Sequence, residues 1–167
     1  WGKSNDLTSP LCNTTGTQEI IGFLNILANN TFYNFATGGR RQAPQAGRCM
    51  YLGNIYSDIS ELYFRHADVD RSQDVNLERA MADRDHTYDT IAYKNNVFYG
   101  KTREFGVFQS HGPRHSTLES FSEALAKEGA YTSDAGVMAT RPPLAAPIAK
   151  DFRPAPDSEA IDRGVKI

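Results

Sequence analysis

The chain has no excess of basic residues and no long hydrophobic run. It carries 18 Lys and Arg against 20 Asp and Glu, a formal net charge of −2. Nucleic-acid binders need positive charge against the phosphates, so nucleic acid is not an expected partner. The longest apolar stretch, residues 20–28, is broken by Gly22 and Asn25. It is too short to span a bilayer, and we expect no membrane span.

Cysteine is scarce. Cys12 and Cys49 could form one disulfide in an oxidising compartment or remain two thiols in a reducing one. The sequence has no zinc-type cysteine spacing, no nucleophile elbow and no glycine-rich phosphate loop. It begins with Trp1 and shows no signal peptide, which favours a processed product or the C-terminal part of a larger protein.

Aromatic and turn-forming residues are plentiful. Eight Tyr and nine Phe, with many Asn, Thr and Gly, favour β structure joined by polar turns. We expect an irregular entry segment over residues 1–19 and β structure over 20–115, with a loop insertion around 68–89. A helix and an extended, proline-rich capping tail should follow over 116–167. Ser116 and Glu119 form a capping-box pattern at the start of that helix.

A short repeat suggests how the β segments are arranged. Residues 29–34 (NNTFYN) match residues 95–100 (NNVFYG), an offset of 66 residues or three times 22. A period of about 22 is typical of one turn of a right-handed parallel β-helix. Asn tolerates the left-handed bends between strands. We therefore expect Phe32 and Phe98 in one interior column, three layers apart, with intermediate turns near residues 51–56 and 73–78. Residues 51–56 fit the pattern loosely, whereas residues 73–78 do not, which favours an insertion or a replaced strand there.

The tail carries a family resemblance. Residues 151–164 (DFRPAPDSEAIDRG) resemble the closing motif of right-handed parallel β-helix proteins in the pectate-lyase-like superfamily. The matching positions are Asp151, Phe152, Arg153, Pro156, Ser158, Ala160, Ile161, Asp162 and Gly164. Pro154, Asp157 and Glu159 depart from the pattern.

The resemblance implies a fold more than a function. The implied fold is an all-β, right-handed parallel β-helix (solenoid) with one short helix and a capping tail, which Arg153 and Asp162 could pin by pairing. The superfamily includes polysaccharide lyases, glycoside hydrolases, epimerases, phage tailspikes and non-catalytic adhesins. Function must therefore be argued from a site.

Acidic residues in one segment follow calcium-loop spacing. Asp68, Asp70, Ser72 and Asp74 alternate as in loops that turn oxygens towards one cation. The pattern fails at Gln73, where glycine is needed, and at Arg79, where a bidentate Glu is needed. Asp68, Asp70 and Asp74 are thus candidate Ca²⁺ ligands, with a solvated acidic loop as the alternative.

Lyase chemistry on uronic-acid polymers needs a cation at the carboxylate, a base for the C5 proton and an acid or water at the leaving oxygen. Four residues are candidates for these catalytic roles: Arg65, His66, Arg84 and Lys94. Asp83, Asp85 and His86 are candidates for substrate binding. Hydrolysis by a facing pair of carboxylates is the runner-up, and solvated surface charges are the alternative for every one of these residues.

Two functional hypotheses follow. The first is the C-terminal part of a secreted or cell-surface carbohydrate-active protein, with a periplasmic location as a variant. It would be a polysaccharide lyase acting on uronic-acid glycans. The second is a non-catalytic structural or adhesive module that assembles with another chain or with the N-terminal part of the same protein.

Overall fold

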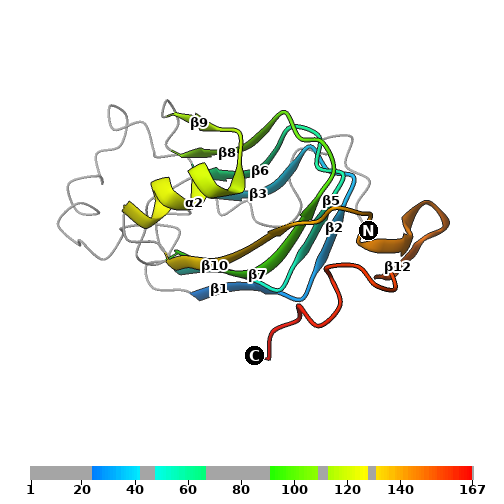
Figure 1. Ribbon diagram of the computed structural model, residues 1–167. Helices are drawn as coiled ribbons and strands as arrows, with labels where there is room; N and C mark the ends of the chain where they lie inside the picture. Colours follow the sequence, from blue (N-terminus) through cyan, green and yellow to red (C-terminus); the bar gives the residue numbers. More distant parts are fainter. Residues whose placement is uncertain (1–23, 42–47, 67–90, 109–112, 128–130, 167) are drawn as a thin grey trace.

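The computed structural model describes residues 24–41, 48–66, 91–108, 113–127 and 131–166, which form strands and one α-helix (Figure 1). The first elements in chain order are β1 (Leu24–Ala28), β2 (Thr31–Tyr33), β3 (Thr37–Arg41), β4 (Arg48–Leu52), β5 (Ile55–Ser57), β6 (Leu62–His66), β7 (Ile91–Tyr99) and β8 (Glu104–Phe108). Then come β9 (Arg114–His115), α2 (Leu118–Lys127), β10 (Tyr131–Met138), β11 (Leu144–Ala146), the 3₁₀ turn η3 (Pro147–Ala149) and β12 (Asp151–Pro154).

Within the described residues, the strands form three sheets. The largest has six strands in the order β1-β4-β7-β5-β2, with β10 also paired to β7, and all its pairs are parallel. β7 joins its two halves, because its first part pairs with β4 and its last part with β5. A four-stranded sheet has β3, β6 and β8 parallel and β9 antiparallel, while β11 and β12 form an antiparallel pair.

The bends between strands fall at residues that tolerate left-handed backbone. Asn29, Gly53 and Asn95 have φ of 56°, 59° and 55° and occupy equivalent places after β1, after β4 and within β7. A second set, made of Asn34, Asp58 and Gly100, follows β2, β5 and β7. Because Asn, Asp and Gly adopt this conformation most readily, the repeated N-N-x-F-Y pattern is explained by the backbone geometry that it permits.

A ladder of asparagine side chains follows the first set of bends, with one asparagine directly after each left-handed residue. The Asn54 backbone N–H and side-chain amide both donate to Oδ1 of Asn96 at 3.1 Å, and Asn30 donates to Oδ1 of Asn54 in the same way at 3.0 and 3.3 Å. Asn96 also donates to the carbonyls of Tyr51 (2.8 Å) and Ala135 (2.9 Å). Asn54 and Asn96 are fully buried, so these bonds satisfy polar groups that have left water.

Aromatic rings stack in the same order beside this ladder. The ring of Tyr56 lies 4.9 Å from that of Phe32 and 5.3 Å from that of Phe98, with both pairs nearly parallel. Phe32 and Phe98 therefore share one interior column, as expected. The expected spacing of three layers is wrong, because β5 pairs directly with both β2 and β7. Of the two expected intermediate turns, residues 51–56 do lie between the two copies of the repeat. Residues 73–78 lie outside the described residues.

Helix α2 covers one side of the core. The spacing of Leu118, Phe121 and Leu125 in the sequence predicts that they share one face of a helix, and all three are buried. The predicted cap is displaced by one residue, because the Ser120 N–H donates to Oγ1 of Thr117 at 3.1 Å. A Cβ on Gly106 would lie 2.4 Å from the ring of Phe121. The helix can thus approach β8 closely only where a side chain is missing.

The predicted fold class is wrong. The described residues show parallel pairing in one six-stranded sheet, but also antiparallel pairs at β8–β9 and β11–β12, and a helix that contributes core side chains. They do not show a right-handed parallel β-helix. The repeat correctly indicated which segments lie in register. A local repeat does not determine how the other strands pair or where the helix packs.

The buried ladder generates a stability prediction. Asn96→Ala should lower the free energy of unfolding by about 2–4 kcal/mol. The change removes the acceptor of the Asn54 N–H and the donor to the buried carbonyls of Tyr51 and Ala135. The matched change Asn30→Ala, at the exposed end of the ladder, should cost less than about 1 kcal/mol. Urea unfolding of both variants checks this, and equal losses would show that the buried amide bonds are not the stabilising feature.

Candidate functional site

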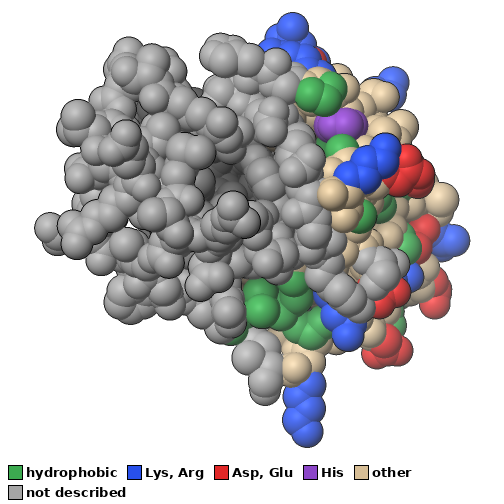
Figure 2. Space-filling model, turned by 90° about the vertical axis from the view of Figure 1, so that its left-hand side faces the viewer, with side chains coloured by type: hydrophobic (Ala, Val, Ile, Leu, Met, Phe, Trp, Pro, Cys, Tyr) green, Lys and Arg blue, Asp and Glu red, His purple; other side chains and the backbone are tan. Residues whose placement is uncertain are grey.

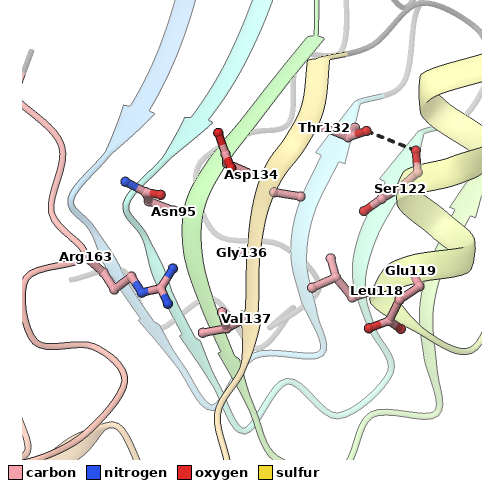
Figure 3. Close-up of a pocket in the computed structure, with 10 residues that line it drawn as sticks. Asn95, Leu118, Glu119, Ser122, Thr132, Asp134, Gly136, Val137 and Arg163 are labelled. Atoms are coloured by element: carbon pink, nitrogen blue, oxygen red, sulfur yellow. Dashed lines mark hydrogen bonds between the residues drawn. The ribbon is translucent and has the colours of Figure 1, made fainter.

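An open hollow of about 390 Å³ lies where α2, β7, β10 and the C-terminal tail meet (Figure 3). Six of its lining residues carry polar side chains: Asn95, Glu119, Ser122, Thr132, Asp134 and Arg163. The tail contributes Arg163 on one side, and the first turn of the helix contributes Glu119 on the other. The hollow thus offers hydroxyl, amide, carboxylate and guanidinium groups to a polar ligand.

The pairing of β7 with β10 forms one wall of the hollow. Asp134 is the register partner of Lys94, and Gly136 is the partner of Asn96. A Cβ on Gly136, where φ is 154°, would lie 2.1 Å from the Asn96 carbonyl oxygen, so the strands need glycine there to come together. The Thr132 hydroxyl donates to the Ser122 carbonyl at 3.2 Å and joins β10 to the helix.

Arg163 is the positively charged side chain among the lining residues, and it is half-buried. Within the described part of the chain its guanidinium makes no ion pair or hydrogen bond. By contrast, the Arg114 guanidinium lies 2.5 Å from Glu104, and that of Arg153 lies 2.7 Å from Asp151. A guanidinium carries five donors in a planar fork that matches a carboxylate. Arg163 therefore presents to the hollow donors that no described residue uses.

Hydrogen bonds hold the tail that carries Arg163. The Asn29 side-chain amide donates to the Val165 carbonyl at 2.8 Å, and the Val165 N–H donates back to Asn29 Oδ1 at 2.8 Å. Earlier in the tail, Oε1 of Glu159 accepts from the Thr140 hydroxyl at 2.7 Å and from the Thr140 N–H at 2.9 Å. The tail is thus fixed both near its end and at its start.

Two carboxylates of the tail have low pKa values. The Thr140 hydroxyl, with the Thr140 N–H next, lowers the pKa of Glu159 from 4.5 to about 2. Hydrogen bonds from Arg153 lower the pKa of Asp151 to about 2. Arg153 donates from Nε and a terminal nitrogen to the two oxygens of Asp151, at 2.9 and 2.7 Å. The expected pairing of Arg153 with Asp162 is therefore wrong, because the Arg153 guanidinium pairs with Asp151, two residues away.

The sequence-predicted catalytic residues are spread over the chain. Lys94 is exposed on β7, beside Asp134 of the hollow. Arg65 and His66 end β6 in the four-stranded sheet, so the structure does not place them on the same sheet as Lys94. The remaining predicted residues lie outside the described residues: Asp68, Asp70, Asp74, Asp83, Arg84, Asp85 and His86.

Sequence reasoning missed most of the hollow. The sequence pattern places Arg163 in a capping tail and Glu119 in a helix cap, and it gives Asp134 no role. One signal was present: residues 131–138 read YTSDAGVM, in which Thr132 and Asp134 alternate as on one face of a strand. The spacing alone did not predict that this face of β10 would lie next to the C-terminal tail.

The wider surface adds two observations. Basic and acidic side chains are interspersed over the described part of the face in Figure 2, without a dominant patch of either sign. No group of three or more His, Cys, Asp or Glu gathers among the described residues. The predicted Ca²⁺ loop lies outside them. A search of the same residues for a membrane-crossing helix found none of sufficient length and apolarity.

Comparisons with known proteins found no matching family model, no matching curated protein and no matching solved structure. The resemblance of residues 151–164 to the pectate-lyase-like superfamily therefore stays a prediction. What can be said about function comes from the geometry of the hollow and its tail.

The Glu159 contact generates a prediction about pH. Thr140→Val should raise the pKa of Glu159 from about 2 towards 4.5, because the hydroxyl is the leading cause of the depression. Since the folded-state pKa lies below the unfolded one, the stabilisation from Glu159 is present above pH 4.5 and is lost as the pH falls towards 2. An NMR titration of the Glu159 carboxyl measures the shift.

Thr132→Val is the matched control, because the Thr132 hydroxyl donates to Ser122 instead. It should leave the Glu159 pKa unchanged. An unchanged pKa in Thr140→Val would show that the hydroxyl does not hold this carboxylate.

Proposed function

We propose that the chain binds a polysaccharide containing uronic acids in the hollow between α2, β10 and the C-terminal tail. The observation that supports this most directly is the half-buried Arg163 guanidinium, which has no partner among the described residues. A carboxylate matches the planar fork of a guanidinium, and a uronic acid presents that group within a hydroxyl-rich ligand.

The other lining groups support a sugar rather than a simple anion. Ser122, Thr132 and Asn95 offer hydroxyl and amide groups, and Glu119 and Asp134 offer acceptors for sugar hydroxyls. The volume of about 390 Å³ falls within the range of small-molecule sites. Because the hollow is open, a polymer could pass through it with one unit held. Such polymers lie outside cells, which agrees with a secreted or cell-surface location.

The reaction in this proposal is β-elimination. A base removes the proton at C5 of the uronate, and the freed electron pair forms a double bond between C4 and C5. The bond from C4 to the leaving oxygen breaks, and water or an acid protonates that oxygen. Arg163 would stabilise the charge that develops on the carboxylate. Lys94, the register partner of Asp134 on β7, would be the base in its deprotonated form.

Arg163→Gln should weaken binding of an oligogalacturonate by about 10-fold or more, because a hydrogen bond to a charged group contributes about 1.5–3 kcal/mol. Isothermal titration calorimetry measures this. Arg153→Gln is the control, since the guanidinium of Arg153 is already paired with Asp151. Equal affinities of wild type and Arg163→Gln would overturn the proposed site.

Lys94→Ala should reduce the formation of unsaturated sugar products by about 100-fold or more, the usual minimum effect of losing a general base. Affinity for the oligogalacturonate should change little. Ultraviolet absorbance of the products gives the rate, and the exposed Lys101→Ala is the control. A wild-type chain that binds the glycan but forms no product would make it a non-catalytic binding module, and the lyase assignment would be wrong.

A further inference from the structure

We infer that Asn29 is a positioning residue that selects for charged sugars: by clamping the C-terminal tail, it holds Arg163 in the hollow. This inference rests on the proposed function and adds the device that determines its preference for a carboxylate. Asn29 and Arg163 are far apart in sequence, and Asn29 is not itself among the lining residues of the hollow.

The clamp is a reciprocal pair of hydrogen bonds. The side-chain amide of Asn29 bonds the backbone of Val165 in both directions, each at 2.8 Å. A primary amide has one donor side and one acceptor side, so it can pair with a peptide group in this way only at a fixed orientation. Val165 is two residues from Arg163, and the clamp therefore restricts where the backbone of Arg163 can lie.

The neighbouring bend residue is shaped for the same tail. A Cβ on Gly53 would lie 3.0 Å from the Arg163 carbonyl oxygen and 3.0 Å from the Val165 nitrogen. It would also lie 2.7 Å from Oδ1 of Asn29. The tail backbone thus passes directly over Gly53, at a distance that a side chain would not allow.

Asn95 is the third of the aligned left-handed positions, after Asn29 and Gly53. Asn29 holds the tail, Gly53 lies beneath it, and Asn95, with the same left-handed backbone, lines the hollow with Arg163. Figure 3 shows Arg163 extending from the tail towards β7 and β10, on the same side as Asn95. One column of bends therefore both anchors the tail and forms part of the hollow that Arg163 reaches.

The clamp could instead only stabilise the fold, and the two roles differ in what they predict. A stabilising contact would lower the unfolding free energy and affect all ligands alike. A positioning contact changes the preference for an oligogalacturonate over its neutral methyl ester, because only the charged ligand uses the guanidinium. The decisive quantity is therefore the ratio of the two dissociation constants, measured on protein confirmed to be folded.

Asn29→Gly is the test variant, because glycine keeps the left-handed backbone and removes only the amide. Asn34→Gly is the matched control: Asn34 has φ of 59° and makes no hydrogen bond to the described part of the tail. We expect Asn29→Gly to lower the preference for the charged oligomer by about 10-fold, with affinity for the methyl ester unchanged. Asn34→Gly should keep the wild-type ratio. Hydrogen exchange of the Val165 amide should accelerate in Asn29→Gly alone.

A second variant guards against loss of folding. Val165→Pro removes the backbone N–H that donates to Asn29 while leaving Asn29 in place, and it should lower the ratio in the same direction. A wild-type chain without preference for the charged oligomer would refute the proposed function itself. A wild-type preference that both variants keep would refute only the positioning role of Asn29.

Discussion

The buried amide of Asn96 is the interaction on which the arrangement depends. It accepts two hydrogen bonds from Asn54 and donates to the carbonyls of Tyr51 and Ala135. It therefore bonds β4, β10 and the bend after β4 from within β7. Asn96 is fully buried, and an unpaired amide there would cost more than the bonds contribute. Register between these segments is set because a one-residue slip would leave all of these groups unpaired.

Fixed register has consequences on both sides of the bend. On the inside, it places Phe32, Tyr56 and Phe98 in a single stack. On the outside, it lines up the left-handed positions Asn29 and Gly53 with Asn95. The tail needs that alignment, because it crosses two of these positions and brings Arg163 to the third. Core packing and the candidate site therefore depend on the same asparagines.

The repeat in the sequence predicted this part of the structure because each copy carries its own bend chemistry. Two adjacent asparagines supply a left-handed residue and an inward amide, and the next aromatic residue points to the core. The apolar face of α2 was readable for the same local reason. The fold class was not, since the antiparallel pairs and the helix that joins the core depend on distant contacts. The hollow was missed because Arg163 and Asp134 line the same hollow only through the return of the tail.

The position of the tail also explains why capping and function need not be separate roles. A segment that covers bends must lie close to them, as Gly53 and Asn29 allow, and its side chains then face the neighbouring strands. Glu159 and Asp151 use their charges on partners within the tail and at its start. Arg163, by contrast, has no ion pair or hydrogen bond from its guanidinium among the described residues, and it lines the hollow. A charge that is paired locally stabilises the tail, whereas Arg163 is the charge of the tail that lies in the lining of the hollow.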